Sequence, residues 1–555
     1  MAEPAQPAPA AAPAPVELPP AGAGEVALVV DGRPVVVPKG TTVLQAAERL
    51  GIVVPHYCYH PGLSIAGNCR MCLVEVEKTP KLQIGCATTA AQGMIVRTTT
   101  PRVTSTRNGI MEFLLINHPL DCPICDQAGE CRLQQYSAEY GTGESRFVEE
   151  KIHHDKRQAI GARVTFDGER CIKCTRCIRF CDEVSKTGEL GLFERGGHAI
   201  IGAFPGRPLD NPYSGNTVDI CPVGALTWRP FRFRARVWFL KDTPSVCAGC
   251  ARGCNVNLAA YDGRIHRITP RFNEEVNSYW MCDIGRQSHE ALYARARLER
   301  PLVRQAPTPA AGAPAGPATA GEALDRAAGL LRAVTSRFGP DALAAVVSAR
   351  LTLEDLYLAK SVLGGLVGVS RLIVPPHEEG EDDDLLIRKD RTPNARGAEL
   401  LGLGAPDAQG LVRLSDDVRA GRLRGLVIVG EDPVGDGLLG EEALRSLEAL
   451  VVVDSWKSPT IQAAHAALPA AGYGEYDGVY VSFAGRAQRA RQAVRPHGLA
   501  DPPWVVLREL GRRFGLSQAY AQASDLFDEV ASHVPALAGL SYRSLGDGGR
   551  SIAGA

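Results

Sequence analysis

The residues in this sequence best suited to chemistry are its cysteines, whose thiolates bind soft metals. Sixteen cysteines occur among 555 residues, and all of them lie between Cys58 and Cys282. Thiols stay reduced inside cells, so this clustering favours metal ligation over disulfides. The spacings divide the cysteines into four groups, each near the four ligands that a cysteine-built metal site needs.

The first group has the spacing C-x10-C-x2-C-x13-C, and we name it the Cys58 group: Cys58, Cys69, Cys72 and Cys86. A long irregular loop of this kind is able to wrap around a [2Fe–2S] cluster. Gly62, Gly67 and Gly85 would let backbone N–H groups approach the sulfurs. The alternative is a zinc site, for which a C-x2-C pair alone is suitable.

The stretch "INHPLDCPICDQAGEC" contains only three cysteines, with a histidine ahead of them. The histidine is either an ordinary loop residue or the fourth ligand of the His118 group: His118, Cys122, Cys125 and Cys131. Imidazole replaces thiolate in some iron–sulfur centres, and no unassigned cysteine lies nearby. We therefore favour ligation by His118.

The run "CIKCTRCIRFC" has the C-x2-C-x2-C spacing typical of a [4Fe–4S] ferredoxin, and its fourth ligand must come from elsewhere. "DICPVGAL" supplies one, which completes the Cys171 group: Cys171, Cys174, Cys177 and Cys221. Cys181 is then left over, and we interpret it as a small buried residue. The basic residues Lys173, Arg176 and Arg179 either tune this site or are solvated surface residues.

The last group, the Cys247 group, has the spacing C-x2-C-x3-C followed by a distant fourth cysteine: Cys247, Cys250, Cys254 and Cys282. A zinc knuckle is a stronger alternative here than in the other groups. Fifteen cysteines and His118 together give sixteen ligands, enough for four sites of four. Separate zinc sites would meet that count but would not explain the recurring ferredoxin spacings.

Short regular elements must position these loops. From Glu25 the sequence alternates apolar and polar residues on both sides of a turn at Asp31-Gly32, and the helical stretch "TTVLQAAERLG" follows with Thr41 or Thr42 as its N-cap. This order predicts a compact β-grasp domain. "NVNLAAYDGRIHRITP" predicts a hairpin that turns at Asp262-Gly263. Beyond residue 321, helical stretches alternate with apolar runs such as "GLVIVGEDP", which predicts an α/β domain with a largely parallel sheet.

The composition is that of a globular protein, with 45% hydrophobic and 22% charged residues and a net charge of -1. The charge gives no indication of nucleic-acid binding, and no apolar run is long enough to span a bilayer. The Ala/Pro-rich first 24 residues lack a basic leader and an apolar core. We therefore expect a disordered tail rather than a secretory signal.

The first three groups, together with "SVCAGCARGCNVNLAAYDGRIHRITPRFNEEVNSYWMCDIGR", resemble the large iron–sulfur subunit of respiratory complex I, NADH:quinone oxidoreductase. The resemblance implies a [2Fe–2S] cluster on the Cys58 group and [4Fe–4S] clusters on the His118 and Cys171 groups. Some bacterial members carry a further [4Fe–4S] cluster that matches the Cys247 group. Cys181 does not match a ligand of the family.

The resemblance also implies a function and partners. A flavin-bearing, NADH-oxidising subunit would supply electrons at the Cys58 group, and they would cross the Cys171 and His118 groups to ferredoxin-like, quinone-branch subunits. The chain would have no catalytic residues of its own and would lie on the cytoplasmic side of the bacterial inner membrane, attached through its partners. Two alternatives stay open: an electron-transfer subunit of a soluble NAD-linked hydrogenase or formate dehydrogenase, and a non-redox, zinc-stapled scaffold.

The C-terminal half contains "AAHAALPAAGYGEYDGVYVSFAGRAQRARQAVRP", which resembles the molybdopterin oxidoreductases. No cysteine follows Cys282, so we expect a degenerate scaffold without molybdopterin. The predicted domains are a disordered tail (1–24), a [2Fe–2S] β-grasp domain (25–105), a His/Cys3 [4Fe–4S] domain (106–145), a ferredoxin-like [4Fe–4S] domain (146–240), a molybdopterin-oxidoreductase-type [4Fe–4S] domain (241–300), a linker (301–321) and the degenerate domain (322–555).

Overall fold

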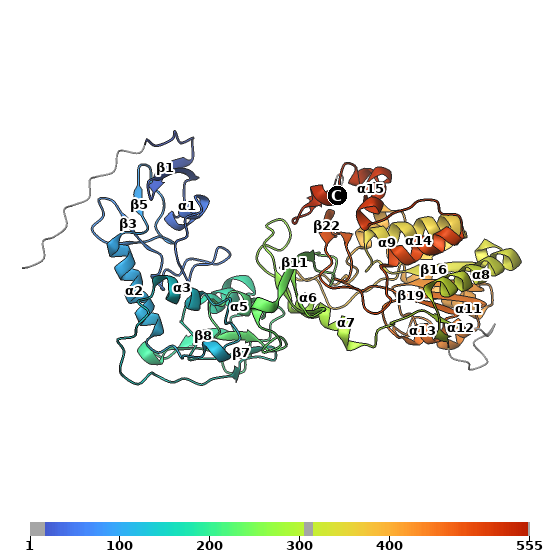
Figure 1. Ribbon diagram of the computed structural model, residues 1–555, viewed down its shortest axis with the longest axis horizontal. Helices are drawn as coiled ribbons and strands as arrows, with labels where there is room; N and C mark the ends of the chain where they lie inside the picture. Colours follow the sequence, from blue (N-terminus) through green and yellow to red (C-terminus); the bar gives the residue numbers. More distant parts are fainter. Residues whose placement is uncertain (1–16, 305–314, 553–555) are drawn as a thin grey trace, which may run out of the picture. The chain divides into compact units, whose positions relative to one another are not determined.

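The computed structural model describes residues 17–304 and 315–552 (Figure 1). Most of the predicted tail and the middle of the predicted linker lie outside these residues. The chain divides into two units, Met1–Arg232 and Phe233–Ala555, and each is described by itself. The predicted boundary at 240 therefore stays a prediction.

The first unit begins with a five-stranded sheet in the order β2-β1-β5-β3-β4. Strands β1 (Glu25–Val30) and β2 (Arg33–Pro38) form the predicted hairpin, in which Asp31 and Gly32 both have positive φ. Helix α1 (Val43–Arg49) follows, capped by Thr42 in a capping box with Gln45. The other strands are β3 (Leu73–Val76), β4 (Gln83–Ile84) and β5 (Ile95–Arg97). The predicted strand–turn–strand–helix order is confirmed.

Two helices and two small sheets make up the rest of this unit. Helix α2 (Pro101–Leu115) starts at the N-cap Thr100, and α3 (Arg132–Tyr140) starts directly after Cys131. One sheet has the order β10-β7-β6 and the other pairs β8 with β9. The remaining bounds are β6 (Gln158–Ala159), β7 (Val164–Phe166), α4 (Arg176–Arg179), the π-helix η2 (Phe180–Val184), β8 (Leu190–Phe193), β9 (Ile200–Ala203), α5 (Asn216–Asp219) and β10 (Leu226–Trp228).

The second unit opens with a meander of β11 (Lys241–Val246), β12 (Asn255–Tyr261) and β13 (Arg264–Pro270). Strands β12 and β13 are antiparallel and turn at Asp262 and Gly263, so the predicted hairpin is confirmed. Helices α6 (Asp283–Gln287) and α7 (Ala291–Ala294) follow, and α6 begins directly after Cys282.

A seven-stranded sheet in the order β15-β14-β20-β19-β18-β16-β17 forms the centre of this unit. Five neighbouring strands are parallel: β17 (Arg371–Ile373), β16 (Leu343–Val347), β18 (Gly425–Val429), β19 (Ala449–Asp454) and β20 (Ala466–Pro469). The predicted parallel α/β sheet is therefore confirmed. Strands β14 (Leu302–Val303) and β15 (Gly316–Pro317) add antiparallel pairs at one edge. Regular structure thus occurs at both ends of the predicted linker.

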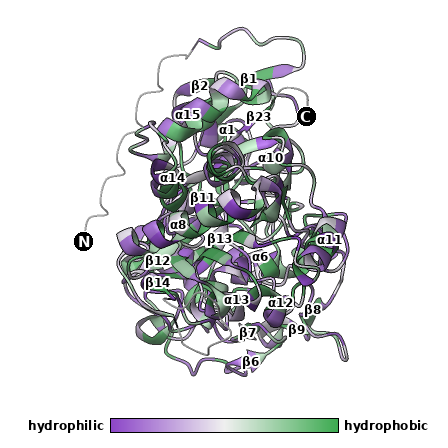
Figure 2. Cartoon of the chain, turned by 90° about the vertical axis from the view of Figure 1, so that its right-hand side faces the viewer, coloured by the Kyte–Doolittle hydropathy of each residue, from purple (hydrophilic) through white to green (hydrophobic). Residues whose placement is uncertain are grey.

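Helices cover both faces of this sheet because alternate strand residues point to opposite sides. In β18, Val427 packs in a core with α8 (Ala320–Phe338), α9 (Leu353–Leu358) and α14 (Pro503–Arg513). Its neighbour Ile428 packs in a second core with α11 (Ala408–Arg419), α12 (Glu441–Arg445) and α13 (Pro459–Ala463). Helices α8 and α11 accordingly carry both hydrophilic and hydrophobic residues (Figure 2).

The last sheet has the order β21-β22-β23, with bounds β21 (Gly478–Val481), β22 (Arg486–Ala490) and β23 (Arg550–Ser551). Apart from short 3-10 turns, the remaining helices of the described residues are the π-helix η8 (Ala359–Val367), α10 (Ala395–Leu400), α15 (Ala523–His533) and α16 (Tyr542–Leu545). Within residues 17–304 and 315–552, no helix combines the length and the apolar character that crossing a bilayer requires.

Candidate functional site

The Cys58 group converges at the edge of the β-grasp sheet. Cys58 follows α1, Cys69 and Cys72 precede β3, and Cys86 follows β4. Cys69 is half-buried and the other three are buried. The four thiols form one hydrogen-bonded chain, in which Cys69 and Cys86 both contact Cys58 and Cys72 contacts Cys86. Residues separated by up to 28 positions therefore come together at one point.

This thiol chain changes the acidity of its members in opposite directions. Hydrogen bonds received from Cys69 and Cys86 lower the pKa values of Cys58 and Cys72, respectively. Hydrogen bonding to Cys58 raises the pKa values of Cys69 and Cys86. The backbone N–H groups of Tyr57 and Cys58 also donate to Cys69 Sγ, both at 3.5 Å. The thiol chain therefore favours the thiolate at Cys58 and Cys72 and disfavours it at Cys69 and Cys86.

The three glycines predicted to allow close approach here differ in role, and the Gly62 N–H donates to His60 Nδ1 at 3.1 Å rather than to a sulfur. A Cβ on Gly85 would lie 2.8 Å from the carbonyl oxygen of Cys72, so this position requires glycine. Gly67 has a φ of +59°, which favours glycine for its backbone conformation. The close neighbour of Gly85 is a backbone oxygen rather than a sulfur.

All four members of the His118 group line one open cavity between α2 and α3. Cys122 is exposed, Cys125 is buried, and Cys131 precedes the first turn of α3. Burial, assisted by the nearby charge of Arg170, lowers the pKa of His118 to about 4. The imidazole is therefore neutral at pH 7, which is the form that ligates metals.

The members of the Cys171 group line one small cavity of about 330 Å³. Lys173 and Thr175, between the cysteines, both have positive φ, and the Lys173 N–H donates to Cys171 Sγ at 3.4 Å. Strain of this kind is typical of functional loops. Burial raises the pKa of Cys171 to about 12 and that of Cys174 to about 11. Metal binding here would therefore release protons.

Cys181 does not line this cavity. It is fully buried in η2, and burial together with the neighbouring Glu189 raises the pKa of its thiol. Its carbonyl accepts hydrogen bonds from the backbone of Thr187 and Gly188. The predicted burial of Cys181 is confirmed, and its role as a non-ligand stays a prediction.

The Cys247 group also lines a single cavity, of about 320 Å³, between the β11–β12 loop and the start of α6. The N–H groups of Gly249 and Gly285 donate to Cys247 Sγ and Cys282 Sγ at 3.4 and 3.3 Å. A Cβ on Gly285 would lie 2.9 Å from Cys247 Sγ, so this approach requires glycine. Burial raises the pKa of Cys282 to about 11.

Arg391 lines the same cavity from the loop after β17, although it was not among the predicted site residues. Its side chain is buried, and its Nε and Nη1 atoms have no hydrogen-bond partner among the described residues. The charge of Arg391 lowers the pKa values of Cys247 and Cys282 against the larger effect of burial. Only the packing of the α/β domain reveals this residue, since 109 positions separate it from Cys282.

Two arginines join the Cys58 group to the Cys171 group. Arg176 is 5% exposed and donates to the carbonyls of Tyr59 and Ile220, the residues next to Cys58 and Cys221. Arg179 donates to the carbonyls of Cys58 and Cys174 at 2.6 and 3.3 Å. For these two residues, the interpretation as solvated surface is therefore wrong. Lys173 is half-buried and bonds the carbonyl of Gly197 at 3.2 Å.

The Cys171 group in turn contacts the His118 group through the loop after Cys221. The carbonyl of Pro222 accepts from the backbone N–H of Arg132 at 3.2 Å and from Cys131 Sγ at 3.9 Å. A Cβ on Gly224 would lie 2.3 Å from Cys125 Sγ, so the two loops touch where only glycine fits. The His118 group also lies beside the Cys58 group, since Arg132, next to Cys131, lies 3.3 Å from His56 Nε2 and Tyr57 packs against Tyr136. The three groups of this unit are thus mutual neighbours.

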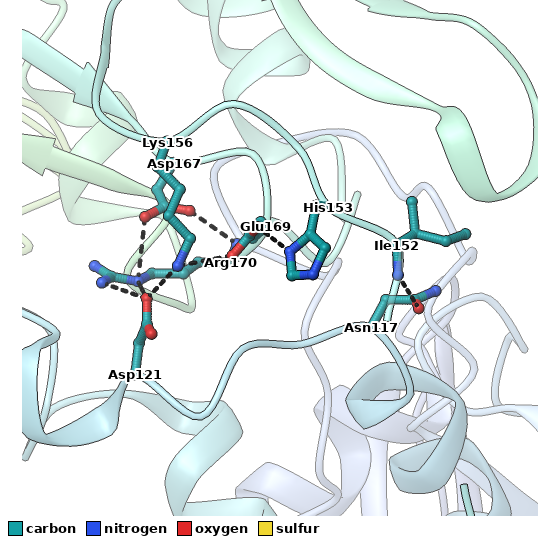
Figure 3. Close-up of polar contacts among 8 residues, drawn as sticks. All are labelled: Asn117, Asp121, Ile152, His153, Lys156, Asp167, Glu169 and Arg170. Atoms are coloured by element: carbon teal, nitrogen blue, oxygen red, sulfur yellow. Dashed lines mark hydrogen bonds and ion pairs between the residues drawn. The ribbon is translucent and has the colours of Figure 1, made fainter. Parts of the chain in front are cut away.

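An ion-pair network borders the His118 group (Figure 3). Lys156 Nζ lies 2.7 Å from both Asp121 Oδ2 and Glu169 Oε2, and His153 Nδ1 lies 2.8 Å from Glu169. Arg170 Nη2 lies 2.8 Å from Asp121 Oδ2. None of these residues was predicted as part of the site, because scattered charges give no pattern along the sequence.

The donor sets fit iron–sulfur clusters. Three groups offer four thiols each, and the fourth offers three thiols and a neutral imidazole, which are ligand types of iron–sulfur centres. Within the part of the chain that the structure describes, no three His, Cys, Asp or Glu side chains form a site for a single metal ion. Each ligand of a four-iron cluster binds a different iron, so cluster ligands need not meet at one point. The ligand assignment stays a prediction.

Family models match five segments of the chain. They are the 2Fe-2S iron-sulfur cluster binding domain (23–101), the NADH-ubiquinone oxidoreductase-G iron-sulfur binding region (107–146), the ferredoxin-like domain of NADH-quinone oxidoreductase subunit 3 (161–227), the molybdopterin oxidoreductase Fe4S4 domain (240–294) and molybdopterin oxidoreductase (394–513). The predicted fold classes of both halves are confirmed.

Curated relatives give the same result. The G subunit of the NADH-quinone oxidoreductase of Rickettsia conorii is 42% identical over 338 residues, which cover 61% of this chain and 49% of the relative. The mitochondrial NADH dehydrogenase [ubiquinone] iron-sulfur protein 1 of Solanum tuberosum is 48% identical over 281 residues, 51% of this chain and 38% of the relative. The chain spans about half the length, or less, of these relatives. The resemblance to the large iron–sulfur subunit of complex I is confirmed over these residues.

Among solved structures, a chain of an NAD+-reducing [NiFe]-hydrogenase in the H2-reduced state is also similar. It is 28% identical with a TM-score of 0.34, and the match covers 38% of this chain and 91% of that chain.

Proposed function

We propose that this chain is an electron-transfer iron–sulfur subunit of a proton-translocating NADH:quinone oxidoreductase, respiratory complex I. In this proposal the Cys58 group holds one [2Fe–2S] cluster, and the His118, Cys171 and Cys247 groups each hold a [4Fe–4S] cluster. When bound, such clusters accept and donate single electrons. Enzymatic activity would then belong to the assembly, and this chain would transfer electrons within it.

The observation that carries the proposal is the continuous contact among three ligand groups. Arg176 and Arg179 join the Cys58 and Cys171 groups, and Pro222 and Gly224 join the Cys171 and His118 groups. A scaffold stapled by metal has no need of neighbouring sites, whereas electron transfer requires them. The order of transfer among these neighbouring groups is the one that the family resemblance implies.

The residues around the groups provide what electron transfer needs from a protein. Burial of most thiols excludes water, which limits solvent reorganisation around each site. Backbone N–H groups of Tyr57, Lys173 and Gly285 donate to Cys69, Cys171 and Cys282. Donation to sulfur disperses negative charge and favours the reduced state, so these contacts help to set the potentials.

The partners follow from the relatives' names and from the resemblance. A flavin-bearing, NADH-oxidising subunit would deliver electrons to the Cys58 group. Ferredoxin-like, quinone-branch subunits would accept them from the His118 group. Membrane attachment would occur through these partners on the cytoplasmic side of the bacterial inner membrane.

The α/β domain would serve as a scaffold without molybdopterin. Its family model and parallel sheet support descent from molybdopterin oxidoreductases. After Cys282 the sequence offers no cysteine to ligate a molybdenum ion. Arg391 and Leu386 from this domain line the cavity of the Cys247 group, so a structural contribution to the fourth site is supported.

Metal and sulfide analysis of the purified chain, combined with low-temperature EPR, tests this function. We expect about fourteen iron atoms, from one two-iron and three four-iron clusters, with matching sulfide. About four zinc ions and no sulfide would favour the zinc-stapled scaffold. Co-purification with hydrogenase or formate dehydrogenase subunits, in place of quinone-branch subunits, would favour the soluble alternative.

A further inference from the structure

Arg170 connects the chain segments of two ligand groups. Its backbone directly precedes Cys171, while its side chain lines the cavity of the His118 group together with Cys125. A Cβ placed on Gly224 would lie 2.3 Å from Cys125 Sγ and 3.7 Å from Arg170 Cδ. The aliphatic part of the Arg170 side chain and Cys125 Sγ therefore both lie next to Gly224.

Two carboxylates fix the orientation of the Arg170 side chain. Asp121 Oδ2 accepts from Nη2 at 2.8 Å and from Nε at 3.2 Å, and Asp167 Oδ2 lies 3.4 Å from Nε. Lys156 bonds the same Asp121 oxygen and also Glu169, so a second cation holds Asp121 in place (Figure 3). The guanidinium is thus held through its Nε and Nη2 atoms.

The remaining nitrogen of Arg170 makes no hydrogen bond to these carboxylates. The residue is 5% exposed, and its Nη1 is buried without a hydrogen-bond partner among the described residues. A buried cationic donor without an acceptor is costly, so such an atom calls for a partner. Burial lowers the pKa of His118 and the charge of Arg170 adds to that effect, whereas burial raises the pKa of Cys125 and the charge of Arg170 opposes it.

We propose that Arg170 is the positioning residue of the His118-group cluster, donating a hydrogen bond from Nη1 to one of its sulfurs. The inference rests on the proposed function, because it requires a cluster at this site. A fixed positive charge beside the cluster stabilises the added electron and raises the reduction potential. Arg170 would thereby make the His118 group a better acceptor from the neighbouring Cys171 group.

Redox titration monitored by EPR on the purified holoprotein tests the charge effect. For Arg170→Gln we expect the equilibrium constant for reduction of the His118-group cluster to fall at least about tenfold, or about 59 mV for a one-electron couple. The other clusters should keep their potentials. Lys156→Gln is the matched control, since Lys156 shares Asp121 but is 34% exposed and does not line the cavity.

The Lys156→Gln control distinguishes a direct effect of the Arg170 charge on the cluster from an indirect effect through Asp121. A clearly smaller shift in Lys156→Gln is expected, because solvent screens an exposed charge. Equal shifts in both variants would mean that Arg170 only braces Asp121, and no shift in Arg170→Gln would also overturn the proposal. A wild-type protein without iron or EPR signals would instead refute the proposed function.

A direct readout uses wild-type holoprotein labelled with 15N-arginine. Pulsed EPR on the His118-group cluster should show a 15N coupling that is absent in Arg170→Lys, which keeps the charge but has no guanidinium. Because it uses the wild-type protein, this measurement tests the hydrogen bond from Arg170 even if Arg170→Gln fails to assemble the cluster. Absence of any arginine coupling in the wild-type protein would refute the hydrogen bond.

Discussion

His118 shows how one side chain changes the chemistry of a metal site. A thiolate ligand adds a negative charge to a cluster, whereas a neutral imidazole does not. The lowered pKa of about 4 keeps His118 neutral throughout the physiological range. As a ligand, His118 would therefore bind iron with a smaller negative charge than a thiolate, which favours the reduced state.

Replacing His118 should separate ligation from charge. His118→Ala should lose one cluster, so the iron content should fall by about four atoms with one EPR signal missing. His118→Cys should keep the iron but lower the reduction potential, because the thiolate adds charge. The exposed His198 serves as control, and His198→Ala should change neither quantity. An unchanged EPR spectrum in His118→Ala would end the assignment.

Gly224 tests the contact between two ligand groups with a single methyl group. A Cβ there would meet Cys125 Sγ at 2.3 Å and Gln127 Cβ at 3.2 Å, so Gly224→Ala must displace the cysteine. We expect loss of the His118-group cluster, seen as about four fewer iron atoms. Gly109→Ala in α2, where nothing lies within 4 Å, should retain all the iron. Equal iron in both variants would contradict the described contact.

At the scale of elements, the parallel sheet buries an acidic residue at the end of β19. Asp454 is 3% exposed and accepts a hydrogen bond from the Ser455 N–H at 2.6 Å. Burial raises the pKa of Asp454 to about 8, and the neighbouring Asp432 and Glu431 add to the rise. The native protein therefore holds a proton there that the unfolded chain releases from about pH 4 upwards.

This raised pKa predicts the pH dependence of stability. Its contribution is fully present below the ordinary value of 3.8 and is lost as the pH rises through about 8. Asp454→Asn cannot ionise, so its melting temperature relative to wild type should rise by several degrees from about pH 5 to about pH 8.5. Thermal unfolding at both pH values measures this difference. The exposed Asp528→Asn should show no such trend, and a falling difference for Asp454→Asn would refute the argument.

At the scale of the whole molecule, the two units derive their stability from different sources. The second unit has large apolar cores on both faces of its seven-stranded sheet. Apart from the β-grasp core, the first unit consists mostly of loops around the ligand groups. Cluster binding should therefore supply much of its folding free energy.

Removal of iron should affect the two units unequally. After treatment with a chelator and reductant, calorimetry should show loss of the unfolding transition of the first unit. The transition of the α/β domain should persist, lowered slightly by loss of the fourth cluster. Reconstitution with iron and sulfide should restore the first transition. Loss of both transitions together would show that the units unfold as one.

The sequence by itself predicted the four ligand groups, because ligand spacing is local and each loop contains most of its own cysteines. The sequence also predicted the hairpin at Asp31, the capped helix after Thr42 and the parallel sheet. Their signals are turn residues, caps and apolar runs, which act over a few positions. The distant Cys221 was assigned to the Cys171 group only because the other three cysteines of that group lacked a fourth ligand.

Only the tertiary structure decided which groups are neighbours and which charges face them. Arg170, Arg176 and Arg391 look like ordinary surface residues in the sequence, yet each is at most 7% exposed and lies beside a ligand group. Burial and through-space charge depend on packing between segments more than a hundred residues apart, as with Arg176 and Tyr59. No local pattern encodes such contacts, because the partners share no spacing along the chain.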